Sequence, residues 1–109
     1  ADDHFEATLY TSDNIGSGGT QNVTNVNFQP DLVWLKNRDA GSTEHTLFDS
    51  SRSTGGNNYH LATNGTAAQV GANSQYGYLS AFNSNGFTLT GGSTNANYVN
   101  QSSKYYIWI

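Results

Sequence analysis

The feature that most constrains the fold is a run of four apolar residues, 32–35, which follows shortly after the only proline of the chain, Pro30. An apolar run of this length, bounded by turn-forming residues, is typical of a strand covered on both faces. Proline is tolerated at the entry to a strand and biases the residue before it, Gln29, toward an extended backbone. The sequence therefore predicts a buried strand with a defined beginning.

The rest of the chain favours a repeat of two residues rather than the repeat of a helix. Twelve glycines are spread along the sequence, and no window of about 11 residues keeps apolar side chains at helical spacing. In residues 5–9 the odd positions are apolar and the even ones polar, which predicts a half-buried strand whose odd positions face the core. Asn and Gly in residues 83–86 predict a hairpin turn between strands at 78–82 and 87–90. Further strands are predicted at residues 23–26, 45–48, 59–62 and 104–109.

Short strands separated by turn signals predict an all-β fold. The candidates are a compact antiparallel β-sandwich, of the jelly-roll or immunoglobulin-like kind, and a small barrel. A length of 109 residues suits a single domain, 1–109. The chain has no cysteine, which excludes disulfides and thiolate metal sites. No apolar run approaches the roughly 18 residues of a membrane-spanning helix, so we expect no membrane partner.

The charge content points away from nucleic acid. Only 11% of the residues are charged and the net charge is −4, whereas an average soluble domain has about 25% charged residues. The four basic residues form no cluster, and binding to a phosphate backbone requires one. The surface must then consist mainly of Asn, Ser, Thr, Gly and Gln, a composition that suits broad hydrogen-bonded contacts of extracellular or virion proteins.

No residue pattern indicates an active site. Glu6 alternates outward on its predicted strand and Glu44 lies at a strand entry, so neither has the apolar surroundings that raise the pKa of a general acid. The three histidines have no metal-binding spacing: His4, His45 and His60. We therefore expect no enzyme activity, no metal and no cofactor.

Charged residues gather around the predicted hairpin of residues 32–35 and 45–48. Because side chains alternate along a strand, Trp34, Lys36 and Arg38 should share one face. Asp31, Asp39 and Asp49 are close enough in sequence to pair with Arg38 or Arg52. The predicted role is a structural group of ion pairs at the ends of the hairpin, each contributing about 0–1 kcal/mol.

Tyrosines next to Asn, Ser and Gly indicate an adaptable recognition surface for glycans or proteins. The predicted ligand-binding residues are Tyr59, His60, Tyr76, Tyr78 and Tyr98. The alternative is that these rings pack inward at strand edges and expose only a polar atom. Trp34 and Trp108 lie within strongly apolar strands and are predicted to belong to the core.

The same apolar strand lies in a longer motif, Phe-Gln-Pro-Asp-Leu-Val-Trp-Leu-Lys-Asn-Arg-Asp at residues 28–39, followed by Leu-Phe-Asp-Ser-Ser-Arg at residues 47–52. This wording resembles a small module in virion surface proteins of tailed bacteriophages, of the marine and cyanophage type. The resemblance continues through residues 61–68 and 82–89. At the final strand, the family's Tyr-Val-x-Trp position corresponds to residues 98–99 or 106–108.

The resemblance implies a β-rich module of tail-fibre-like proteins, where it lies beside lectin-like domains. It implies a non-enzymatic structural or adhesive role at the virion surface, as a tail-fibre domain or as a capsid or tail decoration protein. The implied partners are other virion proteins or a host surface glycan, and particle symmetry implies a homo-oligomer such as a trimer. The alternative is a secreted carbohydrate-binding module that uses the Tyr- and Asn-containing loops.

Overall fold

A computed structural model describes residues 5–13, 18–38, 45–52, 59–66, 68–69 and 77–91, together with the backbone of residues 104–108. The strands are β1 (Ala7–Thr11), β2 (Thr20–Val23), β3 (Leu32–Asn37), β4 (Thr46–Asp49), β5 (His60–Ala62), β6 (Tyr78–Asn83), β7 (Gly86–Thr90) and β8 (Lys104–Trp108). Every regular element of the described residues is a strand, so the predicted all-β fold is confirmed.

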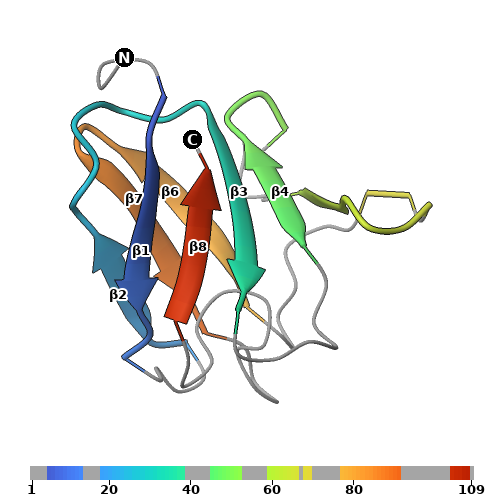
Figure 1. Cartoon of the computed structure of the whole chain (residues 1–109), viewed down its shortest axis with the longest axis horizontal. Helices are drawn as coiled ribbons and strands as arrows, with labels where there is room; N and C mark the ends of the chain where they lie inside the picture. Colours follow the sequence, from blue (N-terminus) through green and yellow to red (C-terminus); the bar gives the residue numbers. More distant parts are fainter. Residues whose placement is uncertain are drawn as a thin grey trace.

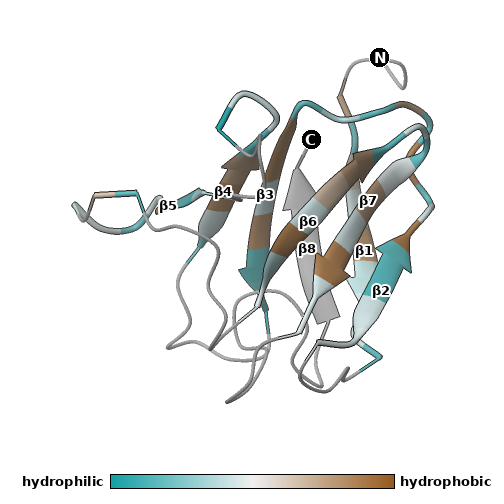
Figure 2. Cartoon of the chain, turned by 180° about the vertical axis from the view of Figure 1, so that it is seen from behind, coloured by the Kyte–Doolittle hydropathy of each residue, from teal (hydrophilic) through white to brown (hydrophobic). Residues whose placement is uncertain are grey.

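The strands form two antiparallel sheets that face each other (Figure 1). One sheet has five strands in the order β1-β8-β3-β4-β5, and the other has three in the order β2-β7-β6. Figure 2, which views the chain from the back, shows the three-stranded sheet in front of β1, β8 and β3, whereas β5 lies beyond its border. The described strands thus make the predicted antiparallel sandwich, as two separate layers rather than a closed barrel.

Both hairpins expected from the sequence are present. β3 pairs with β4, with Val33 opposite Phe48. β6 pairs with β7 through a two-residue turn, because Asn83 lies opposite Gly86. A β-bulge between Leu79 and Ala81 interrupts the regular alternation of β6. Strand β2 begins earlier than predicted, and β1 begins later.

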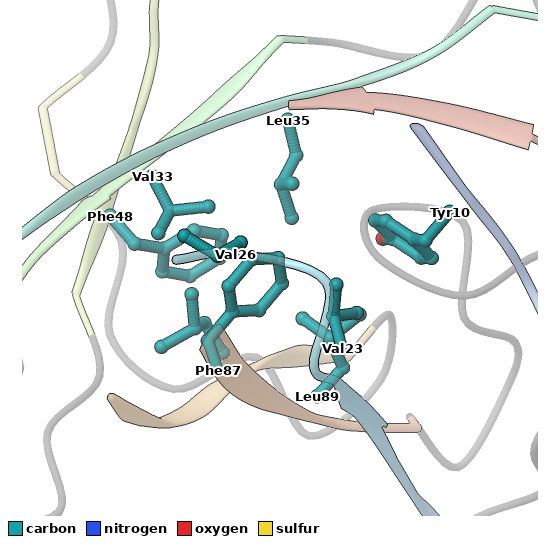
Figure 3. Packing of buried hydrophobic residues seen from close by; sticks show 9 residues of the cluster. Tyr10, Val23, Val26, Val33, Leu35, Phe48, Phe87 and Leu89 are labelled. Atoms are coloured by element: carbon teal, nitrogen blue, oxygen red, sulfur yellow. The ribbon is translucent and has the colours of Figure 1, made fainter. Parts of the chain in front are cut away.

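The core lies between the sheets and combines side chains of both layers (Figure 3). β3 supplies Val33 and Leu35, and β7 supplies Phe87 and Leu89, each at every second position as the pleat requires. Among the described residues, the other buried hydrophobic side chains are those of Tyr10, Val23, Val26, Phe48 and Leu79. Val26 belongs to the segment between β2 and β3, so this connection closes part of the sandwich.

The predicted facing of the first strand is wrong. Phe5 and Leu9 are 58% and 41% exposed, whereas the even-numbered Tyr10 is buried. The ring of Tyr10 meets that of Phe87 edge to face, with centroids 6.2 Å apart. The inward ring of Tyr10 therefore determines which side of β1 faces the core, and the alternating aliphatic residues point away from it.

The predicted burial of both faces of β3 is also wrong, and so is the assignment of Trp34 to the core. Val33 and Leu35 are fully buried, but Leu32 is 44% exposed and Trp34 is only partly buried. Leu32 and Trp34 point to the outer side of the five-stranded sheet, because they alternate with the core residues. Trp108 lies at the register position opposite Trp34, and its side chain is outside the described part of the structure.

Amide side chains bond to the free edges of two strands. Asn25 Nδ2 donates to the carbonyl oxygen of Leu9 and to Thr8 Oγ1, and Gln21 Nε2 donates to the carbonyl oxygen of Thr11. In the other sheet, Gln29 Nε2 donates to the carbonyl oxygen of Phe82 in β6. These bonds occupy acceptors at which another strand would otherwise pair, so they protect the edges of β1 and β6.

Candidate functional site

The structure does not bring the described members of the predicted tyrosine site together. Tyr59 is partly buried before β5, in the five-stranded sheet, whereas Tyr78 is partly buried at the start of β6, in the other sheet. Tyr78 also packs against the core. Tyr76 and Tyr98 lie outside the described residues. A common surface of these residues therefore stays a prediction.

His60 belongs to the interior, so its side chain is not part of the exposed surface, and its ligand-binding role stays a prediction. Its side chain is 1% exposed and its ring lies 5.4 Å from that of Phe48. Burial lowers the pKa of His60, and the positive charge of Arg52 lowers it further. Both effects favour the neutral form of the imidazole.

The predicted ion pair at the hairpin end forms between Arg52 and Asp49. Arg52 donates to the carboxylate of Asp49 through its backbone N–H and its guanidinium group. Burial raises the pKa of Asp49, but the hydrogen bonds and charge of Arg52 outweigh this effect, so the pKa lies below its ordinary value. The pair fixes the end of β4, which is a structural role.

No group of three or more His, Asp or Glu side chains within the described residues lies close enough to hold a metal ion. The described part of the chain also contains no helix of the length and apolar character needed to cross a membrane.

The outer face of the five-stranded sheet carries a row of apolar residues, beside the outward charged residues Lys36 of β3 and Asp49 of β4. Trp34 of β3 lies opposite Leu47 of β4, and Leu47 lies opposite Leu61 of β5, so these residues form a row across three strands. The ring of His45 lies 5.8 Å from that of Trp34 at the border of this row. We call the outward apolar residues of this sheet the apolar face: Leu9, Leu32, Trp34, Leu47 and Leu61.

The outer face of the three-stranded sheet is polar and uncharged. We call it the polar face, and it includes Thr20, Asn22, Tyr78, Ser80, Asn83, Thr88 and Thr90. The exposed Ala81 lies opposite Thr88 on the same side. Thr88 Oγ1 donates to Asn22 Oδ1 over 2.7 Å and accepts from Asn83 Nδ2 over 2.8 Å. Thr90 Oγ1 donates to Ser80 Oγ over 2.9 Å. Hydrogen bonds between side chains therefore link all three strands across this face.

The sequence prediction missed both faces. Alternation of Thr88 and Thr90 with Phe87 and Leu89 did signal an outward polar row on β7. Which strands place their rows beside it depends on the strand order β2-β7-β6, which joins segments distant in sequence. The apolar face had no signal of its own, because its residues read equally well as core.

Comparison with known proteins gives one match. The sequence model of a family described as a domain of unknown function, DUF7483, matches residues 1–109. No curated protein matches the chain, and no solved structure matches it.

Proposed function

We propose that this chain, which belongs to the DUF7483 family, is a non-enzymatic structural and adhesive module at the surface of a tailed-phage particle. It serves there as a tail-fibre domain or as a capsid or tail decoration protein. The observation that carries the contact role is the apolar face. Support for the particle setting comes from the resemblance of residues 28–39 and 47–52 to phage virion modules.

The apolar face has the properties of a protein contact surface. Large hydrophobic side chains are exposed on it, with Leu9 at 41% and Leu32 at 44%. Exposed apolar area marks interaction sites in soluble proteins when it is contiguous, and Trp34, Leu47 and Leu61 form such a row across three strands. Trp34 lies in the central strand of the sheet, and a partly buried tryptophan near the middle of a contact surface is a typical energetic centre of binding.

The outer face of the three-stranded sheet differs in composition from the apolar face. No residue of β2, β6 or β7 is charged, and the outward side chains of these strands are mostly hydroxyl and amide groups. Burial of hydroxyls and amides against a protein requires matched partners, whereas burial of leucine side chains does not. We therefore place the neighbouring virion protein, including further copies in a homo-oligomer, on the apolar face.

Mass spectrometry of purified particles tests the particle setting. The chain should be present at a fixed ratio to the structural proteins of the particle. Its absence from purified particles of the phage that carries its gene would contradict the proposal. Sedimentation of the purified protein tests the contact. The double variant Leu9→Ser and Leu32→Ser should weaken self-association or binding to particles that lack the protein.

The matched control for this variant changes the opposite face. Thr20 is exposed on β2, so Thr20→Ala should leave association unchanged. Equal effects of the two changes would assign the contact elsewhere. Because Leu9 and Leu32 are partly exposed, their replacement should alter the free energy of unfolding by no more than about 1 kcal/mol each.

A further inference from the structure

The polar face is organised more rigidly than a solvated sheet surface requires. Thr88, at the centre, is held from both sides: its hydroxyl donates to Asn22 and accepts from Asn83. Ser80 Oγ, which accepts from Thr90, donates in turn to the carbonyl oxygen of Thr88 over 3.2 Å. These bonds fix side chains on three neighbouring strands, so a ligand would meet them with little further loss of side-chain entropy.

The fixed side chains keep hydrogen-bonding capacity. Asn22 uses its Oδ1 atom in the row, and Asn83 uses its Nδ2 atom. Within the described residues, Asn22 Nδ2 and Asn83 Oδ1 have no hydrogen-bond partner. An amide nitrogen offers two donor hydrogens and an amide oxygen two acceptor sites. The row therefore presents a donor at its β2 end and an acceptor at its β6 end.

The charge of the face restricts the chemistry of a ligand. β2, β6 and β7 contain no Lys, Arg, Asp or Glu. Recognition of phosphate, sulfate or carboxylate groups relies on cationic donors, and these strands have none. A neutral ligand whose groups both donate and accept hydrogen bonds suits the free amide atoms, and sugar hydroxyls have this property.

We propose that the polar face binds a neutral polysaccharide through Asn22 and Asn83, with Thr88 holding both amides in position. Tyr78 lies opposite Thr90 and is fixed by its contact with the core, so its partly exposed ring offers an apolar surface for the C–H groups of a sugar. A sheet face gives each sugar few contacts, and a chain that crosses several strands gathers more of them. This inference deepens the adhesive part of the proposed function, but it uses a different face.

Affinity electrophoresis in native gels tests the proposal. The probes are three neutral polymers (a glucan, a galactan and a mannan) and one anionic polymer, polygalacturonate. At least one neutral polymer should retard the protein in proportion to its concentration, and polygalacturonate should not. Asn22→Asp keeps the acceptor for Thr88 and removes the free Nδ2 donor, so it should weaken the retardation about tenfold or more.

Asn27→Asp is the control, because Asn27 is exposed outside the polar face and the change adds the same charge. As a second measurement, titration of the retarding glycan into isotope-labelled wild-type protein should shift the amide resonances of β2 and β7. Failure of all three neutral polymers, or equal effects of the two variants, would overturn the proposal. Neither result would affect association through the apolar face, which Leu9→Ser and Leu32→Ser test separately.

Discussion

The backbone of Gly86 passes so close to Val23 that a Cβ atom at Gly86 would lie 1.8 Å from the carbonyl oxygen of Val23. Gly86 also has a φ of 154°, which side-chain-bearing residues rarely adopt. The same turn is tied to the neighbouring segment, because the N–H of Val26 donates to the carbonyl oxygen of Asn85. The β6–β7 hairpin is thus docked against the end of β2 by a glycine that leaves room for backbone.

Replacement of this glycine should be strongly destabilising. Gly86→Ala forces the backbone of either Gly86 or Val23 to move and adds conformational strain, so the free energy of unfolding should fall by about 2–4 kcal/mol. Chemical denaturation measures the change. Gly65→Ala is the control, because no atom lies within 4 Å of a Cβ at that position. A cost for Gly86→Ala as small as that of the control would contradict the close approach.

Acidification should destabilise the fold through His60. The pKa of His60 is lowered in the folded state, mainly by burial and also by Arg52. At a pH close to neutral, the unfolded chain therefore binds more protons than the folded one. Stability is therefore fully present above about pH 6.5, the ordinary histidine pKa, and is lost as the pH falls below it.

Denaturation midpoints between about pH 5 and pH 8 measure this dependence, within a range where most carboxylates stay ionised. His60→Gln removes the titrating group, so the variant should be less stable at pH 8 yet show a flatter dependence of stability on pH. An unchanged slope in His60→Gln would show that another group causes the acid sensitivity.

The two aromatic residues Phe48 and Trp34 should differ in their contribution to stability, although both lie in the same sheet. Phe48 is fully buried between the sheets, so Phe48→Ala should cost about 3–5 kcal/mol. Trp34 is partly buried on the apolar face, so Trp34→Ala should cost about 1–2 kcal/mol and should mainly weaken association. Equilibrium unfolding compares the two variants, and equal costs would place Trp34 in the core.

Removal of an edge-capping amide should loosen β1. Asn25→Ala deletes the bonds to Thr8 Oγ1 and to the carbonyl oxygen of Leu9, which should cost about 1 kcal/mol in total. The exposed edge should also raise aggregation on heating, measured by light scattering. Asn27→Ala is the control, because Asn27 bonds to Glu6 through its backbone N–H. Identical scattering of the two variants would show that the edge needs no cap.

The identity and position of most strands followed from local pattern. Alternation at residues 87–90, the apolar run at 32–35 and the turn at 83–86 act over a few neighbouring residues, so they are readable without the fold. The Arg52–Asp49 pair was also predictable, because its members lie three residues apart.

The candidate surfaces depended on contacts between distant segments. The alternation in residues 5–9 does not decide which side of the strand faces the core. Only the packing of Tyr10 on Phe87 turns Leu9 outward. His60 reads as an exposed neighbour of Tyr59, and only its position opposite Phe48 places it inside. The polar face joins Asn22 to Thr88 across 66 positions of the sequence.

The amino-acid sequence by itself determined that the described residues form short strands and no helix, because the period of side chains and the turn residues are local properties. The tertiary structure decided which side of each strand meets water. Which side meets water depends on how two sheets, each assembled from separated segments, share one core. As a result, the apolar residues of one sheet and the hydroxyl and amide groups of the other lie on opposite outer faces.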